Sequence, residues 1–369
     1  VLYTGVAFDI NVACIIPNKE EYLESIYAFV FDKEFKYIIR NLDQKLNVTN
    51  ATIGKAGFEQ EKWKNLYKDK YPNGLPKPYS DDPTQWLFHG YPVKAENALQ
   101  VAVARLLGYR WPAESDEEME LSEEARELIK QVKELQLPFD EDGIVCIPPV
   151  YGEQPAAERL RQLLQKAWGN NWNNNVLANL LKQAGSNKTN LEDWLRDEFF
   201  ANHCKVFQNR PFVWHIWDGR KDGFSVLVNY HKLDKETLKK LIYTYLGDWI
   251  RQCEAKRKAG ESGADGLLSA ALKLKEKLEL ILVGEQPFDI FIRWKKLEEQ
   301  PIGWEPDLND GVRLNIRPFV EAGVLRSRFN VKWGIDRGKN PAGSPWGEIR
   351  DNDRHLRLEE KRKAREGKE

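Results

Sequence analysis

The stretch "RPFVWHIWDGRKDGFSVLVNYH", residues 210–231, constrains the fold of this chain more than any other. It holds two strand-like runs, "PFVWHIWD" and "FSVLVNYH", joined by "GRKDG", a short polar loop bounded by glycines. This pattern predicts a β-hairpin over residues 211–231. Because side chains alternate between the two faces of a strand, we expect Trp214, Ile216, Val226 and Val228 to lie in the core. The polar tip leaves Arg220 and Lys221 able to touch a phosphate.

The rest of the chain predicts a mixed α+β fold. Helical spacing in "EEYLESIYAFVFDKEFKYIIRNLD" alternates with strand-like "VACIIP" and with "KLNVTNATIGKAGF", which is typical of a strand and turn. Ser122 and Asp234 are suited to cap helices that follow them. We therefore expect a small α/β region over 1–112, an acidic helical linker over 113–145, a largely helical body over 146–305 with a helical hairpin at 233–283, and an irregular basic tail over 306–369.

Charge is spread unevenly although the formal net charge is -1. Residues 114–142 hold twelve acidic and three basic side chains, and residues 310–369 hold fifteen basic and ten acidic ones. The tail also interleaves its cations with Phe319, Phe329 and Trp333, as nucleic-acid surfaces do. A solvated terminus with a few core aromatic residues explains the same pattern, and the composition alone does not separate the two.

Motifs for catalysis or metal binding are absent from the sequence. There is no G-x-G-x-x-G, no Walker loop and no C-x-x-C pair, and we expect no metal site. "IPPVYG" is similar to the N-P-P-Y motif of amino-methyltransferases, but Ile147 offers no hydrogen-bond acceptor and Val150 no ring for stacking. His215, Asp218 and His231 are the alternative, an acid–base group on the hairpin with the two histidines as cross-strand neighbours.

The sequence also bears on location and completeness. No apolar run is long enough to span a membrane, and the first residues do not form a signal peptide, so we expect a cytoplasmic protein. The chain opens on Val1 and its single methionine is Met119, which suggests a fragment with its N-terminus upstream.

Several long strings resemble the C-terminal part of large adenine-specific DNA methyltransferases of BREX-type phage defence and type IIG restriction–modification systems. They run in the expected order and include "DDPTQWLFHGYP", "LQVAVARLLGYRWP", "EDGIVCIPP", "YTYLGDWIR" and "PIGWEPDLNDGVRLNIRPF", together with the hairpin stretch. The resemblance implies a parent enzyme that methylates adenine N6, with S-adenosylmethionine and N-P-P-Y held by an upstream methyltransferase domain. This chain then contains no catalytic residue and no cofactor of its own.

The same resemblance implies that the first region belongs to a target-recognition region, so the expected partners are double-stranded DNA, the upstream domain and other defence proteins. The candidate DNA contacts are polar or basic residues of loops and of the tail: Lys45, Asn47, Thr49, Asn50, Lys55, Arg220, Lys221, Arg313, Arg317, Arg326, Arg328, Lys332, Arg337 and Lys339. For the asparagines and threonine, turn and cap chemistry is the competing interpretation. A protein-interaction scaffold within the same defence complex is the alternative function.

Overall fold

The chain divides into two compact units, residues 1–83 and 84–369. The computed structural model describes residues 15–44, 48–72, 88–119, 121–327, 343 and 354–366. The described residues 88–112, which were predicted to belong to the first region, therefore belong to the second unit. Within its described residues the fold is mixed α+β, as predicted.

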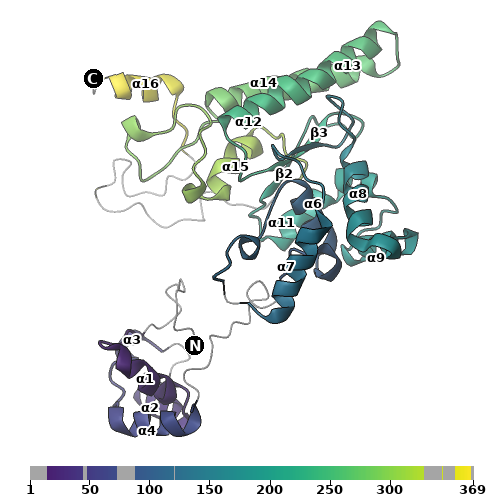
Figure 1. Ribbon diagram of the computed structural model, residues 1–369. Coiled ribbons are helices and arrows are strands. Elements are labelled where there is room, and N and C mark those ends of the chain that lie inside the picture. The colour runs from purple at the N-terminus through teal and green to yellow at the C-terminus, as the bar shows by residue number, and fades with distance from the viewer. Residues whose placement is uncertain are drawn as a thin grey trace. The chain divides into compact units, whose positions relative to one another are not determined.

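The first unit is helical in its described part (Figure 1). Its aromatic core consists of Ala28, Phe29, Trp63 and Tyr67, and α1 packs against α4. The elements are a 3-10 turn (Glu20–Tyr22), α1 (Leu23–Val30), α2 (Lys33–Leu42), α3 (Asn50–Ile53) and α4 (Gln60–Lys70).

Two expectations for this unit change. The strand and turn predicted around "KLNVTNATIGKAGF" are wrong at Asn50–Ile53, which form α3 because the Thr49 hydroxyl accepts the Thr52 N–H and caps a helical turn. The first half of the strand predicted at "VACIIP" lies outside the described residues, and its last three residues are not a strand.

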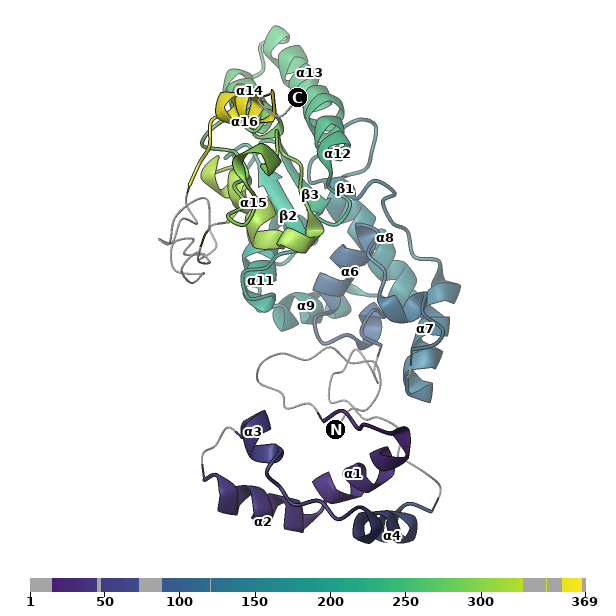
Figure 2. The same cartoon turned by 90° about the vertical axis from the view of Figure 1, so that its left-hand side faces the viewer.

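A three-stranded antiparallel sheet forms the centre of the second unit, in the order β1-β3-β2 (Figure 2). The strands are β1 (Ile144–Cys146), β2 (Val213–Trp217) and β3 (Ser225–Asn229). β2 and β3 form the predicted hairpin, with Trp214 opposite Val228 and Ile216 opposite Val226, all fully buried. The segment after α15 (Val312–Glu321) extends the sheet past β2, since the Trp217 N–H donates to the carbonyl of Val324.

Both faces of the sheet are covered. On the face of Trp214, its ring stacks on Tyr230 and meets Trp304 and Phe319, the latter from α15 (Val312–Glu321). On the opposite face, the ring of His215 contacts that of Phe200 from α11 (Phe199–Val206) edge to face. The tail was predicted to be irregular from residue 306. This prediction is wrong at Val312–Glu321, which form α15 and bury Arg317.

Helices complete the second unit around this sheet. They are α6 (Ala98–Leu106), α7 (Glu123–Leu135), α8 (Ala156–Trp168), α9 (Asn174–Gln183), α10 (Leu191–Asp197), α11 (Phe199–Val206), α12 (Lys235–Lys240), α13 (Leu246–Lys258), α14 (Ala264–Val283) and α16 (Leu358–Glu366), with 3-10 turns at Pro92–Lys94, Pro112–Glu114, Gly169–Asn171, Leu297–Glu299 and Leu308–Asp310. None of the described helices is long and apolar enough to cross a membrane.

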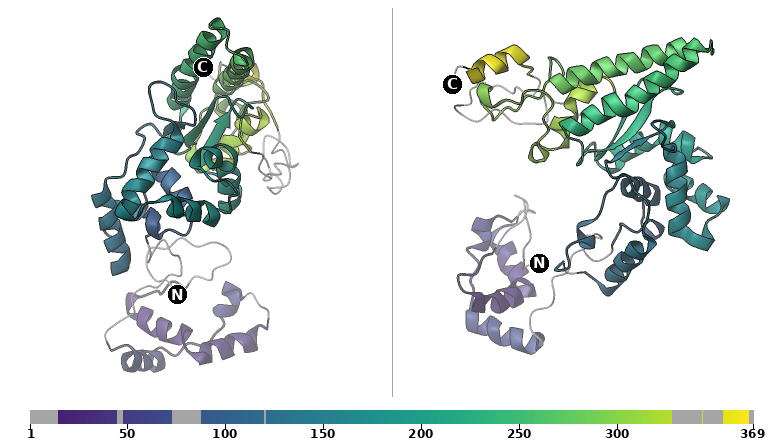
Figure 3. Two further views of the ribbon diagram at one scale, coloured as in Figure 1. Left: turned by 90° about the vertical axis from the view of Figure 1, so that its right-hand side faces the viewer. Right: turned by 45° about the horizontal axis from the view of Figure 1, so that its top comes forward.

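The helical hairpin predicted over 233–283 is present (Figure 3). Asp234 caps α12 by accepting the Thr237 N–H, as expected. A π-helical turn (Leu241–Tyr245) joins α12 to α13, and α13 and α14 then run side by side away from the sheet. Ser122 likewise caps α7, but that helix buries Ala125, Leu128, Ile129 and Val132, so it is part of the body rather than an exposed linker.

Candidate nucleic-acid interface

The candidates in the first unit lie on and beside α3. Asn50 and Lys55 are exposed, whereas Thr49 is the cap of α3 and Lys45 and Asn47 lie outside the described residues. The Thr52 hydroxyl also donates to the carboxylate of Asp43, the C-cap of α2, at 3.4 Å. The turn is therefore anchored to the end of α2, and it presents Asn50 and Lys55 to solvent.

At the tip of the β-hairpin, a carboxylate closes the loop. The Asp218 carboxylate accepts the N–H groups of Arg220 and Phe224 at 2.9 and 2.8 Å. A Cβ at Gly223 would lie 2.3 Å from this carboxylate, so only glycine fits there. The Arg220 guanidinium forms a bidentate pair with Asp222, while Lys221 is exposed. Among the described residues, no carboxylate forms an ion pair with Lys221. The tip therefore presents Lys221 as its one unpaired cation.

Arg317 is buried on α15, with 2% of its surface exposed. Its guanidinium donates to Nε2 of His355 at 3.0 Å, and His355 in turn donates from Nδ1 to Asp289 at 2.7 Å. Asp289 is itself buried beside the ammonium of Lys361. These contacts account for Arg317 within the fold, where it joins α15 to the segment that leads into α16.

Arg326 is also held by the protein. Its guanidinium lies 4.0 Å from the centre of the Trp217 ring, and it donates to the carbonyl of Arg196 and to the carboxylate of Asp197 at 2.7 and 3.0 Å. Hydrogen bonds from Arg196, Lys188 and Arg326 keep the pKa of Asp197 well below its usual range. Arg313 lies partly exposed on α15, and Arg328, Lys332, Arg337 and Lys339 lie outside the described residues, as do Phe329 and Trp333.

The histidines of the hairpin do not form an acid–base group. His215 pairs with Leu227 rather than with His231, which follows the end of β3. Burial lowers the pKa of His215 to about 3, so its imidazole is neutral. The Nδ1 of His231 meets the hydroxyl of Tyr109, which also donates to the carbonyl of Phe212. Together with the use of Asp218 in the loop, this assigns all three residues to the scaffold.

His203, on α11, supports the start of the hairpin. Its Nε2 accepts the N–H groups of Phe212 and Val213, and its Nδ1 faces the side chain of Gln100. Burial lowers its pKa to about 3 as well. No group of His, Cys, Asp and Glu suited to a metal ion occurs in the part of the chain that the structure describes.

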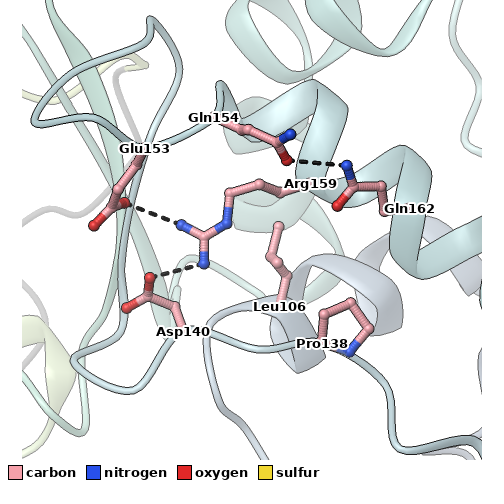
Figure 4. Close-up of a pocket in the computed structure, with 7 residues that line it drawn as sticks. All are labelled: Leu106, Pro138, Asp140, Glu153, Gln154, Arg159 and Gln162. Atoms are coloured by element: carbon pink, nitrogen blue, oxygen red, sulfur yellow. Dashed lines mark hydrogen bonds and ion pairs between the residues drawn. The ribbon is translucent and has the colours of Figure 1, made fainter.

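One polar pocket of the second unit was not predicted from the sequence. It has a volume of about 340 Å³ and is lined by residues from the end of α6, from the segment before β1, from the loop that precedes α8 and from α8 itself (Figure 4). Arg159 spans it, donating to Asp140 at 2.8 Å and to Glu153 at 3.2 Å. The other Asp140 oxygen accepts the N–H groups of Gly143 and Ile144. Burial and the neighbouring Asp142 raise the pKa of Asp140 to about 6.

This pocket is a structural junction. Asp140 joins β1 to α8 through Arg159, and Tyr245, in the π-helical turn, donates to Asp142 and Glu153. The carboxylates are already bonded to protein donors, and no aromatic ring lines the pocket for an adenine to stack on. Its residues do not fit S-adenosylmethionine. The acidic string "DEDG" in the sequence is a signal for it, but Arg159 follows only from the fold.

Comparison with known proteins gives distant similarity to two curated enzymes. No family model matches the chain. It is 26% identical over 187 residues to the adenine-specific methyltransferase PglX of Lacticaseibacillus casei (strain Zhang), covering 48% of this chain and 16% of the relative. It is 23% identical over 195 residues to the adenine-specific methyltransferase BrxX of Escherichia coli O9:H4 (strain HS), covering 49% and 16%. The match thus spans about a sixth of each relative, and this chain is similar to part of BREX-type adenine-specific methyltransferases.

Proposed function

We propose that this chain is the DNA-recognition portion of an S-adenosylmethionine-dependent adenine-N6 DNA methyltransferase of a bacterial defence system. The observation that carries the proposal is its similarity to two adenine-specific methyltransferases over about half of its length. The proposed partner is double-stranded DNA, and the methyltransferase domain with its cofactor is assigned to another part of the parent protein.

The polar residues of the second unit that resemble catalytic groups serve the fold instead, which supports a role in recognition rather than in catalysis. His215 is buried, Asp218 closes a turn, and the "IPPVYG" segment directs Val150 into the core. At the position of the asparagine in N-P-P-Y, Ile147 donates its N–H to the carbonyl of Ser225 and continues the sheet. These residues do not offer the acceptors that a target amino group needs.

Fluorescence anisotropy of a labelled duplex, titrated with the purified chain across a salt series, tests the proposal. Because phosphate contacts release counterions, the affinity should fall steeply between about 50 and 200 mM salt. Binding that does not depend on salt, or no binding at the lowest salt concentration, contradicts the proposal. A single-stranded oligonucleotide of the same length is the control for strand specificity.

A protein-interaction scaffold remains the second candidate, because the helical hairpin exposes apolar side chains. Tyr243, Leu272, Leu280 and Val283 are between 36% and 51% exposed. Size-exclusion chromatography with purified proteins of the same defence system tests it. A shared elution peak that Leu272→Lys abolishes, together with no DNA binding, favours the scaffold over DNA recognition.

A further inference from the structure

The outer face of α2 carries three cations and one tyrosine at helical spacing. Lys33, Lys36, Tyr37 and Arg40 follow the i, i+3, i+4, i+7 pattern that places residues on one side of a helix. All four are exposed, and Tyr37 is 68% exposed, more than any other aromatic side chain described. The spacing in "DKEFKYIIR" is the sequence signal for this face, which the prediction of a helix did not by itself identify.

The opposite face of α2 fixes the helix to the core of its unit. Ile39 is buried, and the ring of Phe35 meets that of Phe29 at 5.0 Å, edge to face. The Asp32 carboxylate caps the helix by accepting the Glu34 N–H at 2.9 Å. The helix therefore holds its outer side chains on an ordered backbone, which lowers the conformational entropy that is lost when a partner binds.

The two lysines of this face, Lys33 and Lys36, are not neutralised by an acidic residue of α2. Glu34 is the only acidic residue of the helix, and it forms an ion pair with Lys62 of α4 at 2.7 Å. No ion pair involves Lys33 or Lys36 among the residues that the structure describes. The exposed Asn50 and Lys55 belong to the turn that is anchored to the C-cap of α2.

We propose that the outer face of α2 is the surface with which the first unit contacts duplex DNA, an inference that rests on the proposed function. Cations repeated along one side of a helix match a line of phosphates, and each contact made on a duplex releases a counterion. The hydroxyl and ring of Tyr37 add a group that hydrogen-bonds to sugar–phosphate or packs on it. The positive face, with no acidic residue of α2 on it, favours this polyanion over a neutral protein surface.

The test compares two full-length variants that lose the same charge. The first, Lys33→Gln/Lys36→Gln/Arg40→Gln, removes the cations of the α2 face. The second, Lys68→Gln/Lys130→Gln/Lys182→Gln, removes three exposed cations from other helices and is the matched control. Affinity for a labelled duplex is measured by anisotropy across a salt series, and circular dichroism checks that both variants are folded.

The α2 variant should bind duplex about 10- to 100-fold more weakly at moderate salt, with a salt slope smaller by about 2 to 3, while the control stays within about threefold of wild type. Equal affinity of the two variants, with wild type still binding DNA, overturns the role of α2 and leaves the proposed function standing. No DNA binding by wild type overturns both. If the α2 variant unfolds, Lys33→Arg/Lys36→Arg and the single variant Tyr37→Ala replace it: the first should keep the affinity, and the second should lower it severalfold.

Discussion

The two units of this protein use their positive charges differently. In the second unit the basic residues that look most suited to DNA, such as Arg317 and Arg326, are held by aromatic rings, carbonyls and carboxylates of the same unit. In the first unit, Lys33, Lys36 and Lys55 extend into solvent. A basic composition therefore does not identify a nucleic-acid surface, because a guanidinium with several protein partners is part of the scaffold.

Arg105 offers the strongest test of this comparison. It is 3% exposed, pairs with the partly buried carboxylate of Glu114 at 3.0 Å, and lies over the rings of Phe88 and Trp111. Arg105→Met leaves that carboxylate and the carbonyl of Gly90 without their partner, so we expect a loss of about 3–5 kcal/mol in the free energy of unfolding. Urea denaturation followed by circular dichroism measures it.

Two variants sharpen this result. Lys33→Met, at an exposed cation of the first unit, should change stability by less than about 0.5 kcal/mol. Arg105→Met/Glu114→Leu should recover much of the loss, because an apolar pair leaves no buried charge. A single Arg105→Met variant that is as stable as Lys33→Met contradicts the scaffold role of the buried cations.

The two units should also differ in how their stability responds to acid. The first unit contains no histidine, whereas the second buries His203 and His215. Both pKa values are lowered to about 3 by burial, so the neutral forms add stability above about pH 6.5 that is lost as the pH falls toward 3. Between pH 7 and 5 each histidine should lower the free energy of unfolding by about 2 kcal/mol.

His203→Gln, followed by denaturation at both pH values, should remove about 2 kcal/mol of that pH dependence. The same acid dependence in His203→Gln as in wild type excludes this assignment.

Substitution of Arg326 should have an intermediate effect on stability and little effect on DNA affinity. Arg326→Gln removes the contact with Trp217 and the bond to Asp197, so we expect a loss of about 1–3 kcal/mol in stability. Affinity for duplex should stay within about twofold of wild type, since the guanidinium serves the fold. A drop in affinity with a salt slope smaller by about 0.9 instead marks Arg326 as a phosphate contact.

Local signals in the sequence predicted much of the fold. The alternation in residues 211–231 gave the hairpin and its buried Trp214, and Asp234 and Ser122 marked two helix starts. These features depend on neighbours a few positions away. The cap at Thr49 was the exception. The β-branched residues around it favoured a strand, but the Thr49 hydroxyl accepts the Thr52 N–H and stabilises a helical turn.

The candidate site was harder to predict. Whether a basic residue is available to DNA depends on its contacts with residues that are distant in the sequence. Arg326 meets Asp197, which lies 129 residues earlier, and Arg317 meets His355, 38 residues later. Nothing in the spacing of either arginine reveals such a partner. The exposed face of α2 was accessible from sequence, since it depends only on the helical repeat of Lys33, Lys36, Tyr37 and Arg40.

The smallest expected effects lie in the turn beside α3, where Thr49 and Lys55 should behave oppositely. Thr49→Ala removes the cap of a short helix and should cost about 0.5–1 kcal/mol, with little change in affinity for duplex. Lys55→Gln should leave stability unchanged and weaken binding a few-fold, since its exposed ammonium has room for a phosphate. Thermal unfolding and anisotropy on the same samples check both. If Thr49→Ala weakens binding more than Lys55→Gln does, without loss of stability, the hydroxyl contacts DNA and the cap is secondary.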